Sequence, residues 1–130
     1  MVLLEIMLPS IPCSSKTERC INCSNHFYEL RHQLTEVYVS KPFKREVPHY
    51  EQIMEDILSC VQINFHELHK FEEKVEDLFI FRAKKGDIHF MYVIDQRKRL
   101  ILLRSFHNFK EYKKYLEKKK EIVKLVKRCE

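Results

Sequence analysis

Two arginines and one histidine stand at comparable positions in three apolar stretches of this 130-residue chain: Arg82, His89 and Arg104. If residues 85–86 and 96–97 form the turns of two β-hairpins, both arginines lie directly opposite His89 in one row of a sheet. Side chains opposed in this way are about 4.5–5.5 Å apart at Cβ, where like charges repel. A phosphate would relieve that repulsion, because a guanidinium can grip it with two N–H groups. The row therefore predicts an anion site.

A second interpretation of the same row needs no ligand. Arg82 and Arg104 could extend outward and pair with Glu72, Glu76 or the C-terminal tail. His89 would be drawn towards its charged form by a phosphate and towards its neutral form by the arginines. Both interpretations stay open on the sequence alone.

More groups that could do chemistry follow the third apolar stretch, in residues 105–112. His107, Lys110 and Tyr112 fall within one turn region, and Lys113 is adjacent. Such groups can act as general acid or base, as a phosphate clamp and as a platform for a nucleic-acid base. The alternative is the start of a helix whose aromatic side chains pack on a sheet.

The N-terminal part of the chain contains a cluster that could bind zinc. Cys13, Cys20, Cys23 and His26 supply four potential ligands, with one C-x2-C pair. A second such pair does not follow, and four ligands within fourteen residues are unusual, so we favour a poorly ordered leader and expect no cofactor.

Composition narrows the class of protein. The chain is 45% hydrophobic and 33% charged, and its formal net charge is +5. This surplus mildly favours an anionic partner, although a Lys- and Glu-rich surface kept for solubility gives the same balance. The opening residues 2–8 lack a basic leader, and apolar runs reach well short of a membrane span. With five cysteines, an odd count, we expect a reducing cytoplasm and no disulfide framework.

Hydrophobic periodicity predicts the elements that position these groups. We expect a strand over 36–40, a helix over 48–63, and a second helical stretch carrying Leu68, Phe71 and Val75. The period then changes to two, which predicts three antiparallel strands over 78–84, 88–95 and 99–106.

The chain is expected to divide at residue 35. Residues 1–34 read as an extension that is partly disordered or forms a short helix over 26–34, and 35–130 as one α+β domain. The only glycine, Gly86, falls in the first turn, where positive φ suits it. A helix capped by Asn108 should then run to Arg128.

The order of these elements and their local sequences resemble the RelE/ParE superfamily of toxins from type II toxin–antitoxin systems. Residues 78–82 (LFIFR) and 87–95 (DIHFMYVID) are similar to the family's "LYRLR…GDYRVIYEID" segment. Residues 99–107 are similar to its final strand, and 37–44 to its opening strand and first helical turn. The Lys-rich helix after Phe106 is more like the HigB branch. The resemblance spans about 35–120.

The resemblance implies a fold with an N-terminal strand, two helices, a three-stranded antiparallel meander and a C-terminal helix. It also implies a metal-independent endoribonuclease that enters the ribosomal A site and cuts mRNA, with attack by the ribose 2′-OH on the adjacent phosphorus. Carried over, catalytic roles fall to Arg82, His89, His107 and Tyr112, and His89 departs from the arginine that many members have there. The RNA-binding residues would be Lys84, Lys85, Arg104, Lys110 and Lys113.

Two other functions remain open at this stage. ParE members are thought to act on DNA gyrase without cleaving RNA, and a degenerate member would only bind a partner. Toxins of this kind are neutralised by a cognate antitoxin protein. We expect such a partner to cover the second apolar face of the sheet or the amphipathic tail.

Overall fold

The computed structural model describes residues 33–59 and 65–128. The elements, in order, are β1 (Glu36–Val39), α2 (Lys41–Glu46), α3 (Tyr50–Leu58), β2 (Glu67–Val75), β3 (Leu78–Lys85), β4 (Ile88–Ile94), β5 (Arg99–Phe106), α4 (Phe109–Glu117) and α5 (Lys119–Lys127). The predicted α+β class is therefore confirmed. The expected helix over 26–34, the cluster Cys13, Cys20, Cys23 and His26, and the end of the helix expected to reach residue 63 lie wholly or partly outside the described residues.

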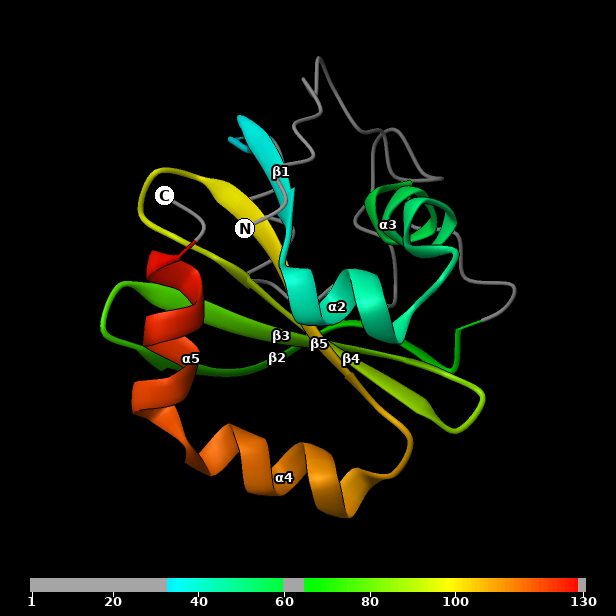
Figure 1. Ribbon diagram of the computed structural model, residues 1–130. Coiled ribbons are helices and arrows are strands. Elements are labelled where there is room, and N and C mark those ends of the chain that lie inside the picture. Colours follow the sequence, from blue (N-terminus) through cyan, green and yellow to red (C-terminus); the bar gives the residue numbers. More distant parts are fainter. Residues whose placement is uncertain (1–32, 60–64, 129–130) are drawn as a thin grey trace.

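A five-stranded sheet in the order β1-β5-β4-β3-β2 forms the centre of the molecule. Strands β2 to β5 make an antiparallel meander, and β1 pairs with β5 in parallel. Figure 1 shows α2 and α3 on one side of this sheet and α4 and α5 on the other. None of the helices in the described part of the chain is long and apolar enough to cross a membrane.

Both faces of the sheet are covered by the chain's own helices. Phe43, Ile53 and Ile57 of α2 and α3 pack on one face. Tyr112, Ile122 and Leu125 of α4 and α5 pack on the other and are at most 5% exposed. The second apolar face that we expected to receive a partner is therefore not free, because the amphipathic tail folds onto it.

The helical stretch expected around Leu68, Phe71 and Val75 is wrong, since these residues belong to β2. The register of β2 against β3 shifts twice, between Glu67 and Lys70 and between Phe71 and Glu73. His69 within the first shift has a left-handed backbone, with φ of 57°. These β-bulges interrupt the two-residue alternation, so apolar residues of a strand fall at a spacing that is typical of a helix.

The C-terminal tail forms two helices, whereas we predicted one. Asn108 caps α4 as expected, because its Oδ1 accepts a hydrogen bond from the Glu111 backbone N–H at 2.8 Å. The chain then turns at Lys118, where ψ is 67° and helical geometry ends. The turn lets α5 bury Ile122 and Leu125 instead of continuing along the line of α4.

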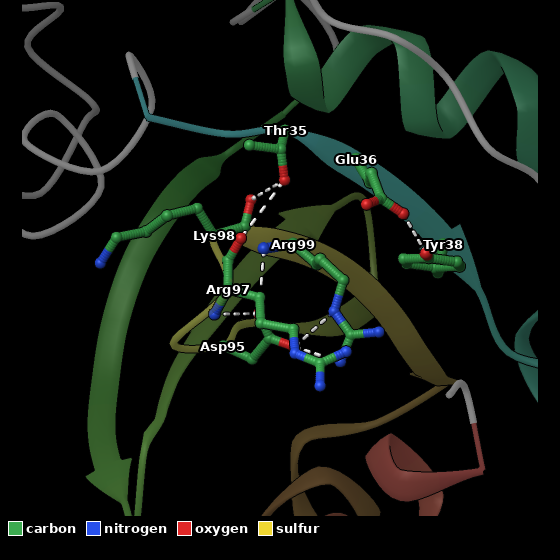
Figure 2. Close-up of polar contacts among 7 residues, drawn as sticks. All are labelled: Thr35, Glu36, Tyr38, Asp95, Arg97, Lys98 and Arg99. Carbon is green, nitrogen blue, oxygen red and sulfur yellow. Dashed lines mark hydrogen bonds and ion pairs between the residues drawn. The ribbon is translucent and has the colours of Figure 1, made fainter.

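The turn between β4 and β5 sets the register of the last two strands (Figure 2). Asp95 Oδ1 accepts hydrogen bonds from the backbone N–H groups of Arg97 and Arg99, each at 3.0 Å. Arg99 Nε donates to Asp95 Oδ2 at 2.7 Å. Lys98 takes a left-handed conformation with φ of 64°. This arrangement is a three-residue loop closed by a left-handed residue, and the expected two-residue loop at 96–97 is wrong.

The loop lengths move the predicted side-chain pairs. In the first hairpin the turn residues are Gly86 and Asp87, so Arg82 lies opposite Met91 and His89 lies opposite Lys84. Gly86 does have positive φ, at 61°, as expected.

In the second hairpin, Arg104 also lies opposite Met91, and the register shifts between Met91 and Tyr92. Because an odd-numbered loop reverses the faces of a strand, Ile101 and Leu103 pack with α4 and α5. Leu100 and Leu102 pack under α2 and α3 instead. A two-residue loop at 96–97 would have placed each of these four residues on the opposite face.

Candidate functional site

Arg82 and His89 are brought together, although they are not directly opposed. Both lie on the sheet face covered by α4, because His89 is two residues from Met91, which pairs with Arg82. Arg82 Nη1 is 3.5 Å from His89 Nδ1. Each residue is 5% exposed. The Arg82 guanidinium lies 5.1 Å from the ring centroid of Phe109 and 5.6 Å from that of Tyr112. The first turn of α4 therefore closes over the arginine.

Carboxylates of the chain itself already pair with Arg82. Its Nε is 2.7 Å from Glu72 Oε1, and its Nη2 is 2.8 Å from Glu67 Oε2. The outward pairing with Glu72 is thus the interpretation that the structure supports, with Glu67 as a second partner. We call Arg82, His89, Tyr112, Glu67 and Glu72 the Arg82 cluster.

Burial fixes the protonation of two members of the Arg82 cluster. Burial, with the charges of Arg82 and Lys84 nearby, lowers the pKa of His89 below its usual value. Burial also raises the pKa of Tyr112 far above its usual value, and Glu72 adds to this rise. His89 is therefore neutral at neutral pH, and Tyr112 keeps its proton, so neither supplies a charge to an anion there.

Arg104 faces a different environment from Arg82. Its Nε and Nη2 donate to Glu46 Oε2 at 2.9 and 2.6 Å, while Glu46 Oε1 accepts from the backbone N–H of Ser105 at 2.9 Å. Hydrogen bonding to Glu46 raises the pKa of Arg104. The guanidinium also lies over the ring of Tyr115 at 5.2 Å. Arg82 and Arg104 thus share one row of the sheet, as expected, but Met91 lies between them in place of His89. The two arginines have separate carboxylate partners.

A groove of about 400 Å³ opens beside α4, next to Arg104. His107 and Asn108 line it just after β5, Lys114 lines it from α4, and Lys118 lines it from the turn between α4 and α5. All four of these residues are exposed. The sequence analysis missed Lys114 and Lys118, although their spacing of four residues from Lys110 predicts one basic stripe along a helix.

Phe109 is the exposed large hydrophobic residue in the described part of the chain, at 45%. Its ring stacks on Tyr112, with centroids 5.9 Å apart and planes 13° from parallel. Lys113 Nζ lies 5.7 Å from the Phe109 ring centroid, and Lys110 is exposed on the same turn. We call His107, Phe109, Lys110 and Lys113 the α4 surface. An exposed ring among cations can stack a base and hold its phosphates.

The two lysines at the end of β3, Lys84 and Lys85, lie on opposite faces of the sheet. Lys84 is opposite His89, on the side of the Arg82 cluster. Lys85 lies over the Phe65 ring at 5.8 Å, and Phe65 belongs to the core under α2 and α3. Of the predicted RNA-binding lysines, Lys84, Lys110 and Lys113 thus share the α4 side of the sheet, and Lys85 does not.

Within residues 33–59 and 65–128, no group of three or more His, Cys, Asp or Glu residues is placed to hold a metal ion. No protein-family model, curated protein or solved structure matches the chain.

Proposed function

We propose that this domain is a RelE-like toxin that binds mRNA through the α4 surface and cleaves it on the ribosome. Support comes from the order of elements: one strand, two helices, antiparallel strands and a basic C-terminal pair of helices, although the meander has four strands where the resemblance implied three. The similarity of residues 78–82, 87–95 and 99–107 to the family's segments supports the same proposal. These segments correspond to most of β3, β4 and β5.

The distribution of charge is the observation that carries an RNA-directed role. Residues 109–128 contain nine Lys and Arg but three Glu, a formal charge of +6, whereas the whole chain carries +5. The entire positive surplus therefore belongs to residues 109–128, which comprise α4, Lys118, α5 and Arg128. Exposed Phe109 stands at the start of this basic segment, so a base-stacking ring adjoins a row of phosphate-binding side chains.

In this proposal the exposed groups of the α4 surface carry the chemistry. In the proposed step, the ribose O2′ bonds to the adjacent phosphorus and the P–O5′ bond breaks, which leaves a 2′,3′-cyclic phosphate. His107 takes the 2′-OH proton, O5′ gains a proton from Lys110 or from water, and Lys113 neutralises the phosphorane. The Tyr112 ring stacks on Phe109 and holds it in place. Tyr112 is fully buried, so its hydroxyl takes no part in the chemistry.

A non-catalytic RNA-binding member is the second candidate function. It is favoured by the burial of three of the four residues to which the resemblance assigns catalysis. Arg82 and His89 are each 5% exposed and Tyr112 is 0% exposed, and two glutamates hold Arg82. An RNA that binds the α4 surface of such a protein would stay intact.

Purified protein added to translating ribosomes, with mRNA ends mapped afterwards, tests these functions. We expect new ends within the translated region, and their loss with His107→Ala but not with His49→Ala, an exposed histidine near the start of α3. RNA binding without new ends would select the second candidate. Inhibition of DNA gyrase without RNA binding would overturn both. Growth arrest relieved by the product of a neighbouring gene would identify the cognate antitoxin.

A further inference from the structure

The edge of Arg82 that could grip a phosphate is already occupied. A guanidinium binds a carboxylate or phosphate most strongly through two parallel N–H groups. In this protein Nε and Nη2 of Arg82 form ion pairs with Glu72 and Glu67 at 2.7 and 2.8 Å, without hydrogen-bond geometry at Nε. The rings of Phe109 and Tyr112 lie over the guanidinium. Arg82 is therefore unavailable to an RNA phosphate in this conformation.

Both glutamates come from β2, the outermost strand of the sheet on that side. Glu67 and Glu72 are five residues apart, and in a regular strand an odd separation places side chains on opposite faces. The register shift between Glu67 and Lys70, which contains the left-handed His69, inserts one residue and corrects this difference. The irregularity of β2 thus allows both carboxylates to reach one arginine, and β-bulges commonly re-aim side chains in this way.

We propose that Glu67 and Glu72 form a carboxylate clamp that keeps Arg82 from anions until β2 moves away. This inference rests on the proposed RNA-binding function and names how the same site is regulated. The two carboxylates occupy the guanidinium, and each of them repels an incoming phosphate. The first contact with RNA is then made by the α4 surface, and Arg82 contributes only after the clamp opens.

Neutralising one carboxylate tests the clamp without changing its shape. We would measure binding of inorganic pyrophosphate and of a single-stranded RNA oligonucleotide to wild type, Glu72→Gln and Glu67→Gln. Glu76→Gln is the matched control, because Glu76 is exposed and follows the same strand with the same change of charge. We expect Glu72→Gln to bind pyrophosphate about 10-fold more tightly than wild type, and Glu76→Gln to bind it as wild type does.

A variant that removes the charges of Glu67, Glu72 and Arg82 together shows whether a gain in pyrophosphate affinity depends on Arg82 or only on the loss of negative charge. In Glu67→Gln/Glu72→Gln/Arg82→Met, no buried carboxylate is left without its arginine, so folding is preserved. The gain in pyrophosphate affinity should disappear there. An equal gain in Glu76→Gln, or a gain that survives Arg82→Met, would overturn the clamp. If Glu72→Gln gains pyrophosphate affinity but no variant binds RNA, the clamp stands and the RNA-binding proposal fails.

Discussion

The two sides of the first turn of α4 use similar residue types for opposite purposes. On the inner side, the Arg82 cluster combines cationic and aromatic side chains with two carboxylates, and its Arg82, His89 and Tyr112 are buried. On the outer side, the α4 surface presents an aromatic ring and lysines to solvent. The difference is the presence of acidic partners: cations with carboxylates become part of the fold, and cations without them remain available to RNA.

The largest expected effect belongs to the inner side. Arg82→Ala leaves Glu72, which is largely buried, without its cation, and we expect a loss of about 3 kcal/mol in the free energy of unfolding. Urea denaturation followed by circular dichroism would measure this loss. Arg45→Ala, at an exposed arginine of α2, should change stability by less than about 0.5 kcal/mol. Equal losses in the two variants would contradict a structural role for Arg82.

Phe109 should show the converse pattern. Phe109→Ala removes a half-exposed ring, so we expect single-stranded RNA binding to weaken by about 1–3 kcal/mol. Tyr50→Ala is the matched control, because Tyr50 also carries a lysine over its ring but belongs to α3 on the other side of the sheet. Fluorescence anisotropy with a labelled oligonucleotide would measure both. Comparable weakening by the two substitutions would remove the distinction between the α4 surface and any aromatic surface.

Lowering the pH should reduce the free energy of unfolding through His89 of the Arg82 cluster. The pKa of His89 is lowered in the folded protein, so the unfolded chain takes up a proton first as pH falls through about 6.5. Its contribution to stability is therefore present above that pH and is lost below it, until the folded-state pKa is reached. His89→Gln should reduce the slope of stability against pH between about 7 and 5. An unchanged slope in His89→Gln would contradict this assignment.

The smallest expected effect is that of single lysines on the outer side. Lys113→Gln should weaken RNA binding for all sequences alike and lower the dependence of log affinity on log salt by about 1. Lys41→Gln, at an exposed lysine of α2, should leave that slope unchanged. A change that depends on RNA sequence would show that Lys113 reads bases and does not only contact phosphate.

The sequence allowed a good account of the three apolar strands but a poor account of what joins them. Strand β5 was predicted at its observed bounds, because long apolar alternation leaves few other structures. The predicted register of β4 against β5 was wrong because Asp95 closes a loop of three residues, not two. A difference of one residue reverses the faces of a strand. Strand β2 was missed because its bulges imitate helical spacing.

The candidate site was predicted in part for related reasons. His107, Lys110 and Lys113 lie close to one another because they are near in sequence, which requires no register. Glu72 was among the partners named for Arg82, but the other carboxylate partners of Arg82 and Arg104 depend on long-range packing. Glu46 comes from α2 and Glu67 from a strand that the periodicity concealed. Pairing between such distant residues leaves no local pattern in a single sequence.

The most direct test of an RNA-binding α4 surface is a titration of isotope-labelled protein with single-stranded RNA, followed by NMR. We predict that the backbone resonances of residues 107–118 shift, with Phe109 and Lys113 among the largest changes, and that those of α3 stay in place. Shifts that are confined to α3 or to the turn at Asp95 would contradict the proposal. It would also be contradicted if wild type shows no shifts and Phe109→Ala behaves in the same way.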